Sequence, residues 1–251
     1  MNKRISPKRY SIGIFGKAVL KETIEMLPKL PDTDLLDDVR EFLCANLHFS
    51  AEQTRQRNAN YIIKRMFQHG YADKPLRDFA KAFPFSIDLK EVCFYRFIHA
   101  ERLQLEIIEE LLIPNIGAGS ISRDCIRAAL KERFPESRSI TDGTSAIADA
   151  FRSCGIAWTD AKRISFSYRN ISSTSFAFIL HSEYPDPGIY SINDLENNRF
   201  IKAMLWNPDR IMYALYELRN RGLISKISEI DGIRQFSTKY TLDETVSNLL
   251  G

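Results

Sequence analysis

Near its C-terminal end, the sequence defines a helix and a β-hairpin that directly follows it. Asn207 is a favoured helix-capping residue, Pro208 suits the first helical position, and Gly222 suits the position just past the last turn. The dipeptide Asp231-Gly232 then joins two strand-like runs, and it is the pair that best suits a two-residue type I′ turn. Because a helix that leads into a short hairpin forms the second half of a winged helix, the sequence predicts a winged-helix module here.

The same order of elements is predicted farther upstream. Apolar residues at helical spacing favour one helix that ends near Phe134 and a second helix that ends at Gly155. Alternating apolar residues over 164–168 and again over 176–180 favour the two strands of a hairpin. Two helices and a hairpin in this order predict another winged helix, in which the second helix is expected to enter the major groove of DNA.

The N-terminal half is predicted to be helical. A basic helix that begins near Ser50 follows a short turn, which gives a helix-turn-helix outline, and a long helical stretch over 87–113 carries an acidic outer face. Pro114 and Gly117 then break the helical pattern. We predict a mainly α protein, an N-terminal helical bundle plus winged helix-turn-helix modules with short β-hairpin wings. The predicted domains are an N-terminal helical domain with helix-turn-helix character (1–116), a winged-helix module (117–188) and a C-terminal winged-helix module (189–251).

The distribution of charge says more about partners than the net charge of +3 does. Between residues 86 and 113 there are six acidic and three basic side chains, whereas between 118 and 170 there are nine basic and six acidic ones. Because phosphates attract cations, the basic segments are the candidates for a nucleic-acid surface, and the acidic helix is expected to point away from it.

We predict a double-stranded DNA interface made from basic side chains and one tyrosine on the predicted basic helices and hairpins. These residue types bond phosphates and base edges. The predicted DNA-binding residues are Arg55, Arg57, Lys64, Arg65, Arg123, Arg127, Lys131, Lys162, Arg163, Arg169, Arg210, Tyr213, Arg219, Arg221, Lys226, Arg234 and Lys239.

Several other functions are not expected. The four cysteines have no C-x-x-C spacing and the histidines are dispersed, so no metal site is predicted. No Walker loop, G-x-S-x-G elbow or glycine-rich dinucleotide turn is present, so we expect no enzymatic activity, no cofactor and no small-molecule substrate. No apolar run approaches the roughly 18 residues of a membrane span, and the N-terminal region makes a poor signal peptide, so a cytoplasmic protein without membrane contact is expected.

The segment over 50–66, S-A-E-Q-T-R-Q-R-N-A-N-Y-I-I-K-R-M, resembles the BrxA family of BREX (bacteriophage exclusion) phage-defence systems. The residues that match the family's threonine and arginine pattern are Thr54, Arg55, Arg57, Ile62 and Arg65. The following K-P-L-R-D-F and F-Y-R-F-I-H-A segments also agree, and weaker agreement extends through the C-terminal modules.

The resemblance implies a helical N-terminal domain similar to RNA-binding antitermination proteins of the NusB type, winged-helix character, and sequence-tolerant binding of duplex DNA within a defence complex. It implies no catalytic residue. Other BREX proteins are then further partners. Two alternatives stay open: an adaptor that assembles defence-complex subunits without touching nucleic acid, and an RNA-binding protein that acts through the helices around Arg55 and Arg57.

Overall fold

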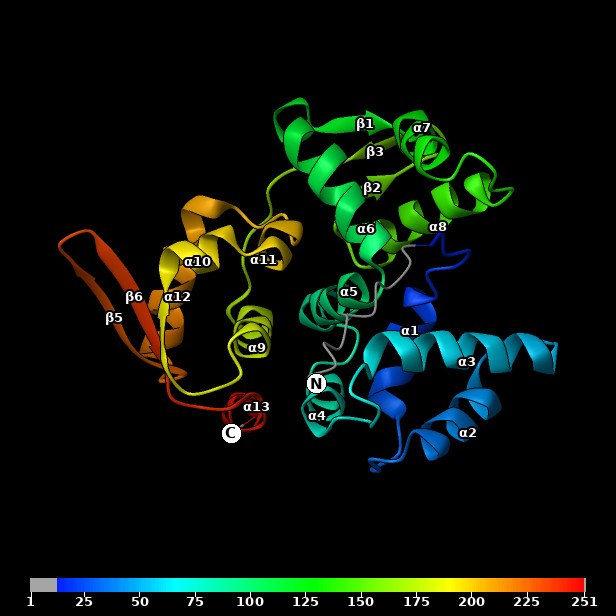
Figure 1. Ribbon diagram of the computed structural model, residues 1–251. Coiled ribbons are helices and arrows are strands. Elements are labelled where there is room, and N and C mark those ends of the chain that lie inside the picture. The colour runs from blue at the N-terminus through cyan, green and yellow to red at the C-terminus, as the bar shows by residue number, and fades with distance from the viewer. Residues whose placement is uncertain (1–12, 251) are drawn as a thin grey trace, which may run out of the picture.

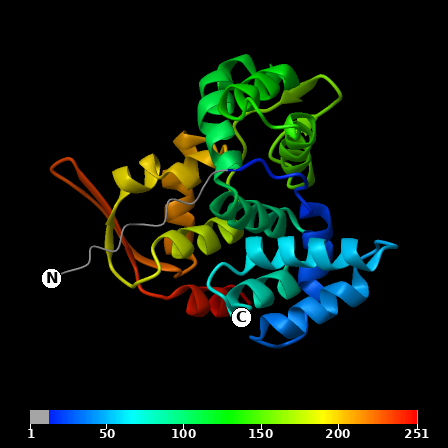
Figure 2. The same ribbon diagram turned by 45° about the vertical axis from the view of Figure 1, so that its right-hand side comes forward.

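The computed structural model describes residues 13–250 of the chain. It is mainly helical, with two small three-stranded antiparallel sheets, and the predicted fold class is confirmed. Figures 1 and 2 show three groups of elements around the central helix α5. The first group and α5 comprise α1 (Leu20–Met26), the 3-10 turn η1 (Leu27–Lys29), α2 (Leu36–Asn46), α3 (Glu52–Met66), α4 (Lys74–Ala82) and α5 (Ile87–Ala100).

Helix α5 forms the centre of the core because its whole circumference is covered. Leu89 and all residues over 91–98 are buried, and α5 packs against α1, α3, α6 and α9. A helix that is buried on every side holds several groups of elements in one structure.

The predicted long helix over 87–113 is broken at Glu101, which leaves helical geometry at φ −111° and ψ 79°. The Glu101 carboxylate accepts a hydrogen bond of 2.8 Å from Nε of Arg65, a contact between residues distant in sequence. Beyond the break lie α6 (Arg102–Ile107), the π-helical turn η2 (Ile108–Leu112) and the 3-10 segment η3 (Ile113–Ala118).

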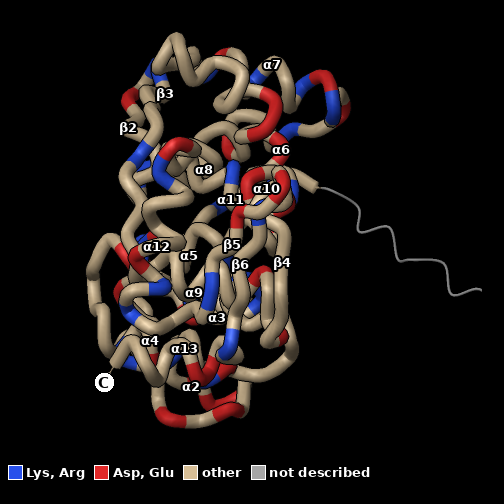
Figure 3. Tube along the Cα trace, turned by 90° about the vertical axis from the view of Figure 1, so that its left-hand side faces the viewer, with Lys and Arg blue, Asp and Glu red and all other residues tan. Residues whose placement is uncertain are grey.

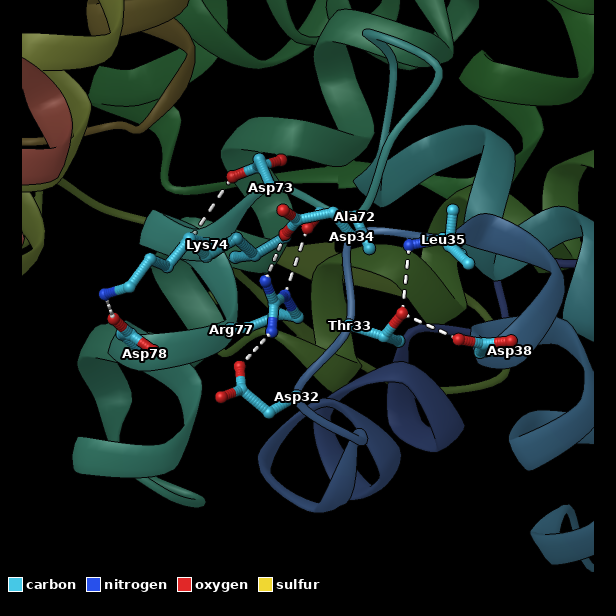
Figure 4. A network of polar contacts seen from close by, with 11 residues as sticks. Asp32, Thr33, Asp34, Leu35, Asp38, Ala72, Asp73, Lys74, Arg77 and Asp78 are labelled. Carbon is cyan, nitrogen blue, oxygen red and sulfur yellow. Dashed lines mark hydrogen bonds and ion pairs between the residues drawn. The ribbon is translucent and has the colours of Figure 1, made fainter.

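Arg77 of α4 ties the loop between η1 and α2 to the helical bundle (Figure 4). Its guanidinium is buried, and it donates to the carboxylates of Asp32 and Asp34 and to the carbonyl oxygen of Ala72. The hydrogen bond from Arg77 is the largest cause that holds the pKa of Asp32 below its ordinary value. One buried cation thus satisfies two carboxylates and a backbone carbonyl.

The first winged module follows η3, and its sheet has the strand order β1-β3-β2. Ser122 caps α7 by accepting from the backbone N–H of Asp124 at 3.1 Å, and Ile121, Ile126 and Ile164 contribute to the core beneath the sheet. Its elements are β1 (Ser120–Ser122), α7 (Arg123–Arg133), α8 (Ile140–Ser153), β2 (Trp158–Thr159) and β3 (Arg163–Ser165).

The predicted hairpin over 164–168 and 176–180 is wrong. The strand β3 pairs with β1 and β2, whereas 176–180 belongs to helix α9 (Ser173–Glu183). The residues over 175–181 are all buried, and α9 packs against α5, α12 and α13. A helix buried on all sides has no polar face, so its sequence lacks the period that distinguishes a helix from a strand.

The second winged module repeats this order, with the sheet β4-β6-β5. The Asn207 side chain accepts from the N–H of Asp209 at 3.0 Å, and Asp231 and Gly232 have φ values of 51° and 78°, as a type I′ turn requires. Both local predictions are confirmed. The elements are β4 (Ile189–Ser191), α10 (Ile192–Asn197), α11 (Arg199–Ala203), the 3-10 turn η4 (Pro208–Arg210), α12 (Ile211–Asn220), β5 (Ile224–Ile230) and β6 (Ile233–Thr238), and α13 (Leu242–Leu250) follows.

Candidate nucleic-acid interface

The outward face of α12 is the most open of the predicted basic surfaces. Ile211, Ala214, Leu215 and Leu218 are buried against the module, so the helix presents its opposite side to solvent. The exposed residues of this side and of the adjoining turns are Pro208, Asp209, Arg210, Tyr213, Tyr216, Glu217, Arg219, Asn220 and Arg221. In a winged helix this element occupies the position from which the major groove is read.

Two arginines on this face stack on tyrosines. The guanidinium carbon of Arg210 lies 5.2 Å from the ring centre of Tyr213, and that of Arg219 lies 4.9 Å from the ring centre of Tyr216. Tyr213 is 66% exposed, so its ring is available to a partner. These contacts hold the guanidinium groups against the helix without neutralising them, because a π face attracts a cation but carries no net charge.

Within residues 13–250, Arg210, Arg219 and Arg221 form no ion pair. Arg221 donates to the hydroxyl of Ser173 at 2.9 Å, and Arg219 has a long contact of 3.4 Å with the side chain of Asn220. The face therefore carries three arginines whose charge is not compensated by a contacting carboxylate. We name Arg210, Tyr213, Tyr216, Arg219, Asn220 and Arg221 the α12 face.

The hairpin beside α12 contributes less than its sequence predicts. Lys226 is exposed on β5, and Lys239 is exposed with its ammonium 4.6 Å from the ring centre of Tyr240. Arg234, in contrast, forms a bidentate ion pair with Glu196, with distances of 3.0 and 2.9 Å. Hydrogen bonding to Glu196 raises the pKa of Arg234. Its charge is already paired, so Arg234 stabilises the wing instead of offering a free cation.

The first winged module brings together Arg123 and Lys162, which lie 39 residues apart in the sequence. The N–H of Arg123 donates to the carbonyl oxygen of Lys162 at 2.8 Å, and the register of β1 on β3 places Ser122 opposite Arg163. The N-terminal end of α7 therefore lies beside the β2–β3 turn. Arg127 and Lys131 continue along α7 as exposed residues, although Arg127 is ion-paired with its neighbour Asp124.

Helix α8, which occupies the groove-reading position of the first module, is unsuited to that role. Its exposed or half-exposed polar residues are Thr141, Asp142, Ser145, Asp149, Arg152 and Ser153, and Arg152 pairs with Asp149 at 2.6 Å. The N-terminal segment over 16–22 lies across it, with a pocket of about 390 Å³ between them. Two carboxylates and a covering segment make the surface of α8 unfavourable for a phosphate backbone, whereas α7 and the β2–β3 turn of this module carry exposed cations.

Two of the predicted DNA-binding arginines lie inside the protein. Arg65 is 2% exposed, donates to Glu101 and to the carbonyl oxygen of Ala18, and contacts the ring faces of three aromatic residues. Arg169 has a side chain only 15% exposed and is ion-paired with Glu91. Both guanidinium groups are largely enclosed and ion-paired within the protein, so these two predictions are corrected: both residues support the core.

The remaining N-terminal candidates lie away from the α12 face. Arg55 donates to the carbonyl oxygens of Phe49 and Ser50, while Arg57 and Lys64 are exposed on α3. Figure 1 shows α3 and α12 on opposite sides of the molecule. The fold therefore does not gather all the predicted cations on a single helix face.

Charge is distributed unevenly over the backbone (Figure 3). Acidic segments gather around α2, whereas along the side on which α12, β2 and β3 lie the lysine and arginine segments alternate with acidic ones. Two members of the α12 face, Tyr216 and Asn220, are not among the predicted DNA-binding residues, and Tyr216 could have been identified from the sequence. Its spacing of three residues from Tyr213 places it on the same side of the helix.

Among residues 13–250, no group of three histidine, cysteine, aspartate or glutamate side chains is arranged to hold a metal ion. Within the same residues, no helix combines the length and the apolar character that crossing a bilayer requires.

No protein-family model matches the sequence, and no curated protein matches it. A solved structure named "SspB crystal structure" is similar, with a TM-score of 0.59 and 12% identity over 94% of this chain and 87% of that chain. At that identity the likeness concerns the fold, which the two chains share over most of their lengths.

Proposed function

We propose that this protein is a non-catalytic, cytoplasmic, double-stranded DNA-binding component of a BREX-type phage-defence system. The observation that carries the proposal is the α12 face, where Arg210, Arg219 and Arg221 are exposed without a paired carboxylate on the groove-reading helix of a winged module. A helix of this kind binds duplex DNA when its exposed side chains reach phosphates and base edges.

Phosphate contacts dominate the proposed binding. Arginine forms charge-assisted hydrogen bonds with phosphate oxygens, and these contacts carry no information about the base sequence. Asn220 and Tyr213 are the groups of the α12 face that offer limited groove contact. Lys226 on the adjacent strand lies on the same module and extends the cationic surface toward the wing. The result is affinity for duplexes with little sequence preference.

The first winged module adds a second cationic surface in this proposal. Arg123, Lys162 and Arg163 meet where the N-terminal end of α7 adjoins the β2–β3 turn. Because α8 is acidic and partly covered, this module contacts backbone phosphates and does not insert its second helix into the groove. Two surfaces on one chain increase affinity when both engage the same duplex.

The assignment to a BREX system rests on the sequence resemblance to the BrxA family over residues 50–66 and the segments that follow. The winged-module architecture after an N-terminal helical region agrees with what that resemblance implies. Other proteins of the same defence system are the proposed protein partners, and no small-molecule substrate or cofactor is needed for this role.

The test is a salt-dependent titration of a blunt-ended duplex with wild-type protein and with the triple variant Arg210→Ala/Arg219→Ala/Arg221→Ala. The logarithm of the affinity of the wild type should fall linearly with the logarithm of the salt concentration. The triple variant should bind more weakly, and its slope should be smaller by about 0.9 for each phosphate that the variant no longer neutralises. Equal affinity and equal slope for the two proteins would refute the proposal.

A matched control keeps the change in net charge constant. Lys21, Lys29 and Lys81 are exposed cations of the N-terminal region, away from the α12 face. The variant Lys21→Ala/Lys29→Ala/Lys81→Ala loses the same formal charge as the α12 variant. If this control binds duplex DNA as the wild type does, the weaker binding of the α12 variant results from the position of the three arginines and not from the change in net charge.

A protein-interaction adaptor is the second candidate, and the wing of the second module favours it. Ile230 and Ile233 face each other at the tip of the β5–β6 hairpin and are 63% and 61% exposed. Exposed apolar side chains at a hairpin tip are suited to contact with another protein. In this alternative, Ile230→Ser/Ile233→Ser abolishes capture of other BREX subunits, while the α12 variant captures them normally and duplex binding is absent from the wild type.

A further inference from the structure

The solvent face of the first module's sheet carries an exposed tryptophan. Trp158 on β2 is 64% exposed, whereas Thr159, Ile164 and Ile121 on the opposite face of the sheet are buried. The other tryptophan, Trp206, is 3% exposed. Leaving an indole ring in water forgoes the large stabilisation that burial of an aromatic ring provides, so the position of Trp158 favours a partner outside the folded chain.

Polar and cationic groups surround this ring. Trp158 is paired directly with Ser165, and Arg163, two residues before Ser165 on the same face of β3, is its diagonal neighbour. Diagonal neighbours in an antiparallel sheet lie within reach of long side chains. The third strand adds Ser120 and Ser122 opposite Ser165 and Arg163. The face thus combines one large aromatic ring, a guanidinium and several hydroxyl groups.

More positive charge lies at the end of the same sheet. Lys162 is exposed in the β2–β3 turn, and the N–H of Arg123 bonds its carbonyl oxygen. The ion pairs found within residues 13–250 include none of Arg123, Lys162 and Arg163, and Nε of Arg123 is buried without a hydrogen-bond partner.

The carboxylate of this turn, Asp160, is directed to the backbone. Its Oδ1 accepts from the N–H groups of Lys162 and Arg163 at 2.7 Å each. These backbone hydrogen bonds lower the pKa of Asp160. The carboxylate therefore shapes the turn that presents the two cations, and three cations face one acid.

We propose that Trp158, Arg163 and Lys162 form a platform for single-stranded nucleic acid, on which an unpaired base stacks on the indole ring while the cations bind the adjoining phosphates. Aromatic rings beside a cationic track are the combination by which proteins bind unpaired strands without sequence preference, because every base has a π face. A partner that carries both negative charge and aromatic rings can stack on the indole ring and pair with the cations at the same time. The proposal rests on nucleic acid as the partner and is independent of the α12 face.

Intrinsic fluorescence tests this platform directly, because the exposed Trp158 is accessible to an added strand and the buried Trp206 is not. A single-stranded oligo-dT of about 12 nucleotides, within the site size of single-strand binders, should quench the fluorescence of the wild type. The variant Trp158→Ala should lose that quenching and bind the oligonucleotide about 5-fold or more weakly, and Trp158→Phe should retain most of the affinity. Tyr71→Ala, which removes an aromatic ring that is 50% exposed outside the platform, should bind as the wild type does.

The outcomes separate this platform from the duplex-binding proposal. If oligo-dT binds wild type and Trp158→Ala equally, or does not bind the wild type, the platform is refuted. A blunt duplex has no unpaired base to stack on Trp158, so its binding by Trp158→Ala should equal its binding by the wild type, whereas the α12 triple variant should bind it more weakly. Loss of oligo-dT binding by Trp158→Ala together with unchanged duplex binding by the α12 triple variant upholds the platform and removes the duplex proposal.

Discussion

Glu91 and Arg169 form an ion pair that joins the central helix α5 to the segment between the two winged modules. The Glu91 carboxylate is 2% exposed and also accepts from the hydroxyl of Ser175 on α9 and, at 3.3 Å, from the indole N–H of Trp206. Burial raises the pKa of Glu91 and lowers that of Arg169, while each charge opposes the shift of the other. The two ions thus depend on each other.

The backbone of Arg169 extends this junction toward α12. Its N–H donates to the carbonyl oxygen of Leu205 at 2.8 Å, and its carbonyl oxygen accepts from the N–H of Asn207 at 2.9 Å. Asn207 is the residue that caps the turn leading into α12. The start of α12 is therefore held in place by Arg169, which is itself ion-paired with Glu91 of α5.

We expect Glu91→Ala to lower the free energy of unfolding by about 3–5 kcal/mol, because it leaves the guanidinium of Arg169 largely buried without a counter-ion. Urea denaturation followed by circular dichroism measures the change. The double variant Glu91→Ala/Arg169→Met should recover part of the loss, since it removes the unpaired charge as well. If the double variant has a lower free energy of unfolding than Glu91→Ala, with the losses of the two single variants simply adding, the two residues are not coupled and the prediction is contradicted.

Arg65→Met should destabilise the protein without weakening duplex binding by the protein that remains folded. The substitution leaves Glu101, whose side chain is 13% exposed, without its partner and removes a hydrogen bond to the carbonyl oxygen of Ala18. The loss should be about 3 kcal/mol or more in the free energy of unfolding. Arg57→Ala on the exposed side of the same helix should change stability by less than about 0.5 kcal/mol, and it serves as the control.

Tyr213→Ala should weaken duplex binding by a few-fold and leave stability nearly unchanged. The ring is 66% exposed, and it holds the guanidinium of Arg210 at 5.2 Å, an interaction of about 0.5–1 kcal/mol at an exposed site. Electrophoretic mobility shift at fixed salt measures the effect. Tyr213→Phe keeps the ring face and should bind almost as the wild type does; if it binds as weakly as Tyr213→Ala, the hydroxyl and not the stacking is responsible.

Stability in acid should depend on Glu183 of α9. Burial alone would raise the pKa of this carboxyl, but contacts with His99, Tyr95 and Asn198 at 2.9, 2.6 and 2.6 Å together hold it below its ordinary value. Because the pKa is lower in the folded state, the ionised form stabilises the fold above the ordinary glutamate pKa of about 4.3, and this contribution is lost as the pH falls through the lower folded value.

The measurement is the melting temperature as a function of pH for wild type and Glu183→Gln. The difference between the two should be largest at neutral pH and should shrink below about pH 4. Glu136→Gln, at an exposed position, should follow the wild type throughout. A difference between wild type and Glu183→Gln that stays constant from neutral to acidic pH would contradict the assigned role.

The parts of the structure that the sequence predicted correctly are those decided by near neighbours. The capped start of the α12 segment at Asn207 and the turn at Asp231-Gly232 depend on hydrogen bonds and backbone dihedral angles within a few residues. Helix α7, with its stripe of Arg123, Arg127 and Lys131, likewise follows from helical spacing. The predicted boundaries of the three domains stay predictions.

Only the tertiary structure decided which charged side chains are exposed to solvent. Arg65 and Arg221 look alike in the sequence as arginines in or beside a basic helix, yet the first is enclosed by α5, Glu101 and the N-terminal segment and the second is exposed. The strand predicted within α9 failed for the same reason, because complete burial removes the polar face that would mark a helix. Local preferences are set by adjacent residues, whereas burial is set by segments distant in the sequence that close over a side chain only when the chain has folded.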